Sequence, residues 1–316
     1  MKTSAKIIKE LLYCLLIFLG VSVLTFTLGR LAPGDAVDNY LKATDTIVTD
    51  VEREAARKYL GLDQPVSVQF FRWLFNAVRG DFGISYSTGR PVLQEILFGL
   101  PVTLRLTVYT LAVTLLLSVP SAWLCAVRCG KFADHFVRFL NTLVMALPTF
   151  CIGLFIMLIL GVRLKWFPIV SGTGFRRYVM PTLTLSIAMS AGMIRFFRTQ
   201  FLEALETEHV LYARAMGVSW ARVFAHHILP NTAFPIITYL GLRLGGLLGG
   251  SYLIETMFAL NGAGGLLVNA VGVRDYPLIQ GYALFMAAVY IGIRLLTEAA
   301  GMLLDPKIRR KYEVAV

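Results

Sequence analysis

The stretch Leu106–Val127, LTVYTLAVTLLLSVPSAWLCAV, holds no charged residue over 22 consecutive positions. At about 1.5 Å per residue a helix of this length crosses the roughly 30 Å of hydrocarbon in a bilayer. Leu11–Gly29 and Phe139–Val162 are uncharged in the same way. A cleaved signal peptide is the alternative for the first run, but its 19 residues exceed an ordinary signal-peptide core and no small-residue cleavage site follows. Three membrane-spanning helices are therefore predicted.

Three further apolar runs predict three more spans. They are Tyr178–Ile194, Thr232–Ile254, which is interrupted by Arg243, and Pro277–Thr297, which contains Arg294. The whole chain of 316 residues is 57% hydrophobic and 16% charged, well below the roughly 25% charge of a soluble domain. The predicted fold class is an all-α integral membrane protein with six transmembrane helices.

The net charge of +11 comes from basic residues that flank the apolar runs, so it does not indicate a nucleic-acid binder. Fourteen Lys and Arg residues lie in Met1–Glu10, Arg128–Arg138, Arg195–Leu229 and Leu304–Val316. The positive-inside rule places these segments and both termini in the cytoplasm. On the opposite face, Leu31–Pro101 holds seven basic and nine acidic residues. The loop Arg163–Arg177, with four basic residues, opposes this topology but is outnumbered.

The four cysteines, Cys14, Cys125, Cys129 and Cys151, all lie in or beside apolar runs. None falls in the long outer segment, so no disulfide framework is predicted. Cys125 and Cys129 stand four apart and are able to share a metal, although packing is the more common role of such residues.

The outer segment has local helix signals. Thr49 and Glu52 form a capping-box pattern ahead of a helix over Val51–Leu60, and Gly61 is placed to end it. Apolar residues at helical spacing predict a second helix over Val66–Arg79, followed by a turn at Gly-Asp-Phe-Gly. This small exoplasmic subdomain is expected to cover the mouth of a pore or to dock a soluble substrate-binding protein.

The loop between the fourth and fifth spans, Arg198–Asn231, predicts a helix, a break and a second helix. Gly217 can adopt the positive φ that closes the first helix, and Ser219 can cap a second helix over Trp220–Leu229. A helix-turn-helix DNA reader has the same shape, but this loop is tethered between two membrane spans. We therefore expect a rigid cytoplasmic knuckle and no nucleic-acid partner.

Parts of this loop suit contact with another protein. Ala213 and Ala215 are small enough to allow close approach, and Trp220 and Phe224 are apolar anchors of the kind that dominate interfaces. The candidate coupling residues are Tyr212, Ala213, Arg214, Ala215, Gly217, Ser219, Trp220, Phe224, Leu229 and Pro230.

The loop resembles the EAA loop of type I ABC importer permeases, whose pattern is Glu-Ala-Ala-x-x-x-Gly followed after a helix by Leu-Pro. Ala213, Gly217, Leu229 and Pro230 match it in place. Leu211 and Tyr212 stand where the Glu and first Ala are usual, and His227 stands where an Ile is usual, as in the dipeptide, oligopeptide and nickel branch of the family. Further landmarks of that branch are 30–35, 60–65, 80–85, 274–277 and 305–309.

The resemblance implies the type I ABC importer fold, divided into an N-terminal tail and first span (1–31), an exoplasmic subdomain (32–101), a five-helix core (102–303) with the coupling loop (198–230), and a cytoplasmic tail (304–316). It also implies a second homologous permease subunit, two ATPase subunits that bind ATP and Mg, and an extracytoplasmic substrate-binding protein, in a bacterial cytoplasmic membrane. The chain itself has no Gly-x-x-x-x-Gly-Lys-Ser/Thr phosphate loop and is expected not to be an enzyme. The run Asn261–Gly265 lacks the spacing of a nucleotide loop and is interpreted as a tight exoplasmic turn.

The fifth span contains the candidate path or gate residues Gly241, Arg243, Gly245, Gly246 and Gly249. The glycines favour close helix packing or, alternatively, a bending gate. A charge at the membrane centre costs about 3 kcal/mol unless it faces water or a partner, which makes Arg243 a path or interface candidate. Arg294 and Glu298 are assigned to an intrahelical pair.

The cargo is the least determined prediction. The stretch Asp81–Val92, with Asn39-Tyr40-Leu41, is more similar to nickel permeases than to dipeptide permeases, so nickel or a metal chelate is the main expectation and a di- or oligopeptide the alternative. The four histidines fall in predicted cytoplasmic loops, and no metal ligand set is predicted along the path. A channel or secondary transporter is the alternative of another class; a membrane enzyme would need an intramembrane acidic or His cluster, and the spans contain none.

Overall fold

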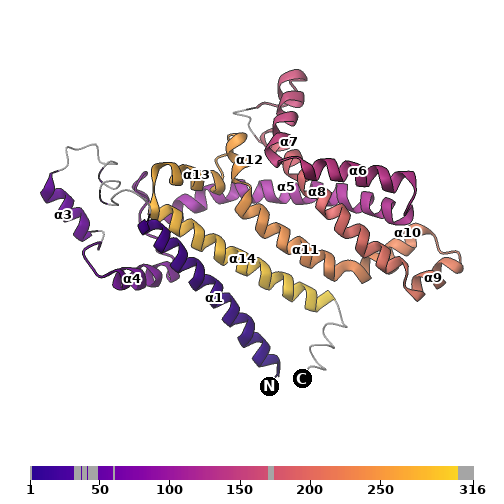
Figure 1. Cartoon of the computed structure of the whole chain (residues 1–316), viewed down its shortest axis with the longest axis horizontal. Helices are drawn as coiled ribbons and strands as arrows, with labels where there is room; N and C mark the ends of the chain where they lie inside the picture. Colours follow the sequence, from indigo (N-terminus) through magenta and orange to yellow (C-terminus); the bar gives the residue numbers. More distant parts are fainter. Residues whose placement is uncertain are drawn as a thin grey trace. The chain divides into compact units, whose positions relative to one another are not determined.

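The computed structural model describes residues 2–31, 37, 41, 49–59, 61–169 and 174–304, and these are almost entirely helical (Figure 1). The elements are α1 (Lys2–Leu31), α3 (Asp50–Tyr59), α4 (Val66–Val78), α5 (Val92–Val127), α6 (Phe132–Ala146), α7 (Thr149–Ile156), the π-helix η1 (Met157–Arg163), α8 (Arg176–Leu205), α9 (Glu208–Ala215), α10 (Trp220–Val223), the π-helix η2 (Phe224–Ile228), α11 (Leu229–Gly250), α12 (Tyr252–Met257), α13 (Ala263–Val273) and α14 (Tyr276–Leu304). The landmark residues 32–36, Asn39, Tyr40 and the tail 305–316 lie outside the described residues.

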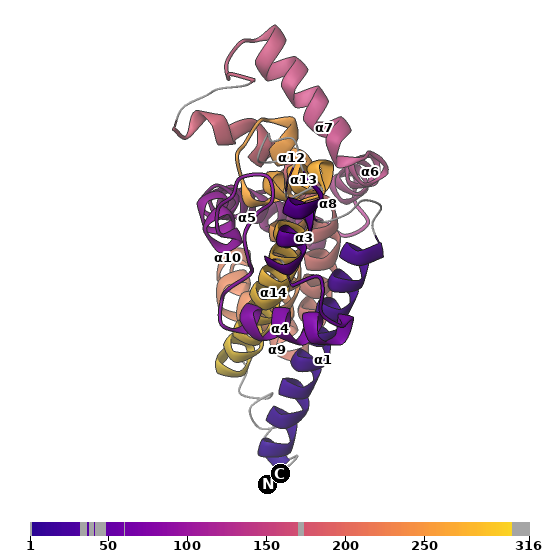
Figure 2. The same cartoon turned by 90° about the vertical axis from the view of Figure 1, so that its left-hand side faces the viewer.

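Five helices are long and apolar enough to cross a membrane, and a bent pair brings the number to six within the described part of the chain. The five are α1, α5, α8, the continuous helix from Trp220 to Gly250, and α14. The predicted third span is the exception. α6 and α7 meet at an angle of 102°, and Figure 2 shows α7 pointing away from α6. Pro148 directly precedes α7 and supplies no amide hydrogen to continue α6, so an unbroken helix over Phe139–Val162 was wrong.

The outer segment follows its prediction closely. The backbone amide of Thr49 donates to Glu52 Oε2 at 2.9 Å, and the amide of Glu52 donates back to Thr49 Oγ1 at 3.4 Å. The Thr49 amide, as the largest cause, and the Thr49 hydroxyl, which donates to Glu52 Oε2 at 2.9 Å, hold the pKa of the Glu52 carboxyl below its ordinary value. Gly61 has φ of +66° and ends α3, as expected. α4 ends at Val78, and Gly80 and Gly83 form the predicted turn with positive φ.

The chain forms two compact units, and the first comprises residues up to Thr103 together with Leu260–Gly292. Its core contains the buried residues Val92, Ile96, Ala263, Ala270, Leu278 and Tyr282. This core explains why α5 begins at Val92, well before the predicted span. The helix also continues through Pro101, because burial of the Val92 and Ile96 side chains stabilises it by more than the loss of the one hydrogen bond that the proline cannot donate. The residues interpreted as a turn, Asn261–Gly265, instead begin α13 at Ala263.

The second unit comprises Leu104–Ala259 and the end of α14 from Ile293. Its core joins α5, α8 and the segment after α8 through the buried residues Ala122, Met193, Phe197, Phe201, Val210, Val223 and Ile228. The pair assigned to structure is present, since Arg294 Nε lies 3.2 Å from Glu298 Oε1. This unit carries the loop that the sequence singled out.

Candidate functional site

The predicted knuckle consists of residues 207–228 and follows the end of α8 (Figure 1). Gly217 has φ of +79°, and its amide donates to the Arg214 carbonyl at 3.0 Å, so it closes α9 as predicted. Ser219 lies at the start of α10 in extended conformation but makes no side-chain capping bond. The prediction that the Ser219 side chain caps this helix was therefore wrong. The Ser219 carbonyl accepts a hydrogen bond from the Val223 amide at 2.9 Å, and Ser219 is exposed.

The second helix of the knuckle does not end at Leu229. α10 passes through η2 directly into α11, so that a single helical path runs from Trp220 to Gly250. Pro230 follows η2 after Leu229, and the wider turn of this π-helix accommodates a residue that has no amide hydrogen to donate. The knuckle is thus continuous with the helix that contains the candidate path residues.

Arg214 connects the two helices of the knuckle, α9 and α10. Its Nη1 donates to the Val218 carbonyl at 2.7 Å, and its guanidinium carbon lies 3.7 Å from the centre of the Trp220 ring. A guanidinium over an indole face is the most favourable cation–π arrangement. These two contacts fix the angle across the Gly217 break.

The inner side of the knuckle is packed against the rest of the second unit. Val210, Val223 and Ile228 are fully buried, and Ala213 is buried as well. Ala213 therefore packs inward, against the expectation that it leaves room for another protein. Phe224 is also directed inward, with its ring centre 4.8 Å from that of Trp123 on α5, so it anchors the knuckle rather than presenting a free apolar surface.

The outer side of the knuckle presents an apolar surface, which we call the outer patch: Leu211, Tyr212, Ala215 and Met216, with the edge of Trp220. The exposed fractions are 57% for Leu211, 68% for Tyr212 and 67% for Met216, against 39% for Trp220. Leu211 and Met216 were not among the predicted site residues. Their helical spacing could have predicted this surface, because positions 211, 212, 215 and 216 share the face of α9 opposite to Val210 and Ala213.

A hydrogen bond joins the start of α9 to the start of α11. Asn231 Nδ2 lies 2.9 Å from His209 Nε2 and also donates to the His227 carbonyl at 2.7 Å. The adjacent Leu229 and Pro230 are exposed. In the part of the chain that the structure describes, no group of three or more His, Cys, Asp or Glu residues is arranged to hold a metal ion.

The glycines of α11 divide into two kinds. Gly241 is buried, and a Cβ there would collide with the Thr297 side chain, so this position serves close packing. Gly246 and Gly249 have no neighbouring atom within 4 Å of an added Cβ among the described residues, and Gly245 is half-buried. Only the later glycines therefore remain candidates for a path or a gate.

Arg243 is exposed and lies along α8. It donates to the Tyr239 hydroxyl at 2.5 Å, and the Tyr239 ring stacks on Phe196 with centres 4.2 Å apart. An added Cβ at Gly192 would lie 3.3 Å from Arg243 Nη2, so the guanidinium lies close to the backbone of α8 at that point. The guanidinium keeps further donors for a partner, water or cargo.

Comparisons with known proteins agree with the architecture. The family model described as "Binding-protein-dependent transport system inner membrane component" matches residues 118–310, and its N-terminal companion model matches residues 5–107. The "Glutathione transport system permease protein GsiC" of Escherichia coli (strain K12) is 34% identical over 310 residues, covering 96% of this chain and 99% of that protein. The "Probable peptide ABC transporter permease protein y4tP" of Sinorhizobium fredii is 34% identical over 313 residues, covering 96% and 98%.

Proposed function

This chain belongs to the family of binding-protein-dependent transport system inner membrane components and is an ABC importer permease, and from that premise we propose that it carries a short peptide across the membrane. The relatives named above are described as glutathione and peptide permeases, and glutathione is itself a tripeptide. Both cover nearly the full length of this chain. The peptide alternative is therefore better supported than the nickel expectation.

The residues that favoured nickel have a role that does not depend on the cargo. Asp275 is fully buried and accepts hydrogen bonds from Ser85 Oγ at 2.5 Å and Ser87 Oγ at 2.9 Å. Both serines belong to the Asp81–Val92 stretch that resembles nickel permeases. Their pairing with Asp275 stabilises a loop of the first unit, so their presence carries no information about a metal.

The outer patch is the observation that supports ATP coupling. A rigid, exposed apolar surface beside the Gly217 break is suited to dock a separate protein, because large apolar side chains at a fixed geometry contribute most of the energy of an interface. We propose that an ATPase subunit docks there and that its movement is passed along the Trp220–Gly250 helix to Gly246, Gly249 and Arg243.

The remaining arrangement follows from the family and from charge. We propose that both termini and the knuckle lie in the cytoplasm, that a second homologous permease subunit completes the path, and that two ATPase subunits bind ATP and Mg. The substrate-binding protein then delivers cargo to the face that carries α3 and α4.

A test of docking uses the assembled transporter in proteoliposomes. Leu211→Glu combined with Met216→Glu places two charges in the outer patch and is expected to abolish ATP-driven uptake while membrane insertion is unchanged. The control is Lys131→Glu, which replaces a positive with a negative charge at the exposed start of α6, where acidic residues are tolerated. Uptake by the double variant at the wild-type rate would refute docking at this patch.

A test of cargo compares uptake of glutathione, dipeptides, nickel and a nickel chelate by the wild-type transporter with its binding protein. Uptake of a peptide is expected, and uptake of nickel alone would refute the peptide proposal.

A further inference from the structure

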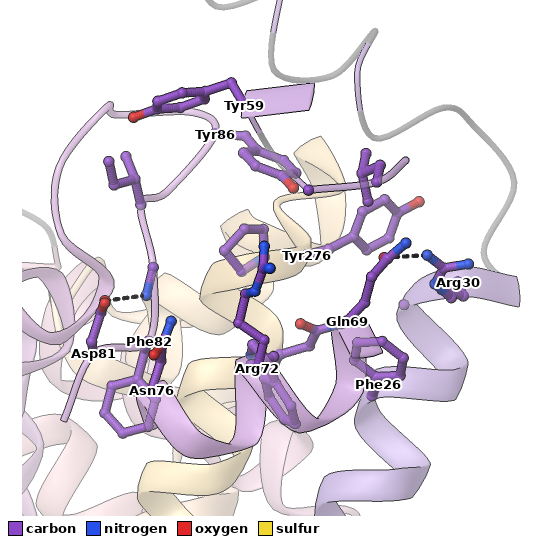
Figure 3. Close-up of a pocket in the computed structure, with 18 residues that line it drawn as sticks. Phe26, Arg30, Tyr59, Gln69, Arg72, Asn76, Asp81, Phe82, Tyr86 and Tyr276 are labelled. Atoms are coloured by element: carbon purple, nitrogen blue, oxygen red, sulfur yellow. Dashed lines mark hydrogen bonds between the residues drawn. The ribbon is translucent and has the colours of Figure 1, made fainter. Parts of the chain in front are cut away.

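A pocket of about 490 Å³ lies wholly within the first unit (Figure 3). Its wall is formed by the end of α1, by α4, by the residues after α3, by the loop after α4 and by the start of α14. Aromatic side chains make up much of this wall: Phe26, Tyr59, Trp73, Phe82, Tyr86 and Tyr276. A volume of this size and an aromatic lining are typical of small-molecule sites.

The charge of the pocket is opposite to that of the segment around it. Arg30 and Arg72 line it, and among the residues that the structure describes Asp81 is the sole acidic one in the wall. The Asp81 carboxylate accepts from the Gly83 amide at 2.9 Å and so belongs to its own turn. The pocket is therefore a basic site in an outer segment that has more acidic than basic residues.

Arg72 is the charge available to a ligand. Figure 3 shows its side chain rising from α4 toward Tyr59 and Tyr86. Arg30 hydrogen-bonds Gln69, whereas within the described ranges Arg72 forms no ion pair. Gly61, with φ of +66°, lies beside this guanidinium, since an added Cβ at that position would lie 3.2 Å from Arg72 Nη1. A planar guanidinium in an aromatic pocket is suited to bind a carboxylate through two parallel hydrogen bonds.

Side-chain amides in the wall add to this polarity. Asn76 and Gln280 also line the pocket, and their side-chain amides can pair with a peptide bond. Together with Arg72, these groups match a small molecule that has one carboxylate and several amides.

We propose that this pocket binds the C-terminal carboxylate of a short peptide through Arg72, before the peptide enters the path. The inference rests on the proposed function, since it assigns an entry site to the same cargo. The pocket volume favours a free peptide over a protein loop, and an acidic side chain of the binding protein is the alternative source of the same carboxylate chemistry.

The test measures binding of triglycine and of its C-terminal amide, triglycinamide, to the intact transporter in lipid nanodiscs, without ATP or binding protein. Calorimetry is expected to show that triglycine binds and that the amide binds at least tenfold more weakly, because a charge-assisted hydrogen bond is lost. Arg72→Gln is expected to weaken triglycine binding at least tenfold. Arg79→Gln is the matched control, since Arg79 directly follows the same helix but stacks on Phe75 outside the pocket.

Equal binding of the acid and the amide, or unchanged binding by Arg72→Gln, would overturn the proposal. If Arg72→Gln does not assemble, Arg72→Lys provides the test, with affinity expected to fall severalfold because the bidentate geometry is lost. Failure of triglycine to bind, combined with weaker docking of the binding protein to Arg72→Gln, would assign the pocket to a protein carboxylate and also overturn it. A separate experiment tests the proposed function itself: wild-type proteoliposomes supplied with ATP and binding protein would show no peptide uptake if that function were wrong.

Discussion

Asp134 and Arg198 form a bidentate ion pair in the second unit. Arg198 Nε donates to Asp134 Oδ1 and Nη2 donates to Oδ2, each at 2.7 Å, and the Asp134 side chain is only 1% exposed. The Gly130 amide also donates to Asp134 Oδ2 at 3.0 Å. The pair therefore joins the start of α6 to α8 through a carboxylate whose oxygens are both hydrogen-bonded.

Asp134→Asn is expected to lower the stability of the permease by about 3 kcal/mol, because it leaves the Arg198 charge partly buried without its partner. The midpoint of thermal unfolding in detergent measures this loss. Arg195→Gln is the control, since Arg195 lies one turn earlier on α8 and is exposed. Equal unfolding midpoints for wild type and Asp134→Asn would show that the pair contributes no net stability.

Gly99→Ala tests the close approach of α5 and α13 within the first unit. An added Cβ would lie 2.8 Å from the Ala263 nitrogen and 2.9 Å from the Gly262 carbonyl carbon, and backbone atoms cannot rotate away. Overpacking of this kind costs about 1–3 kcal/mol, and it would also disturb the 2.9 Å hydrogen bond from the Ala263 amide to Thr103 Oγ1.

The control for Gly99→Ala is Gly246→Ala on α11, where an added Cβ meets no described atom within 4 Å. This change is expected to be neutral or slightly stabilising, since alanine favours a helix more than glycine does. The midpoints of thermal unfolding of the two variants are compared in the same experiment. Equal midpoints for Gly99→Ala and Gly246→Ala would contradict the prediction.

Local signals in the sequence predicted the elements that depend on neighbouring residues. The capping box at Thr49 and Glu52, the end of α3 at Gly61 and the break at Gly217 all depend on side chains or φ preferences within one turn. The charge-free runs Leu11–Gly29 and Leu106–Val127 located α1 and α5 for a similar reason, because a membrane-spanning helix must be apolar along its own length.

Tertiary contacts decided what the sequence did not predict. α5 starts at Val92 because that residue and Ile96 are buried against α13 and α14, which lie about 170 residues further along the chain. The direction of Phe224 depends on Trp123, and the inward position of Ala213 depends on the same core. The pocket around Arg72 combines five separate segments, so no contiguous pattern indicated it.

Asp275→Asn is expected to destabilise the loop of residues 84–91 by about 2 kcal/mol. The carboxylate accepts from Ser85, from Ser87 and from the Leu278 amide at 3.3 Å, and an amide group replaces one of its two acceptor oxygens with a donor. Faster cleavage of this loop by added protease measures the effect. Because Ile84 and Tyr86 line the pocket, triglycine binding should weaken as well.

Asp63→Asn is the control for Asp275→Asn. The Asp63 carboxylate accepts a 3.3 Å hydrogen bond from the side chain of its neighbour Gln64 and is exposed. Unchanged protease resistance of the Asp275→Asn loop would show that the two serines are held by the backbone alone.

Arg214→Lys is expected to uncouple ATP hydrolysis from uptake. A lysine keeps the charge, but it loses the planar contact with the Trp220 ring and the fixed hydrogen bond to the Val218 carbonyl, so the angle across Gly217 becomes variable. The outer patch stays intact, and the ATPase subunit still docks, but less of its movement reaches the helix that begins at Trp220. The amount of peptide taken up per ATP hydrolysed should fall severalfold, whereas Arg222→Lys, an exposed position on α10, should leave it unchanged. A wild-type ratio in Arg214→Lys would show that the Gly217 break is held by the buried core of Val210 and Val223 without help from Arg214.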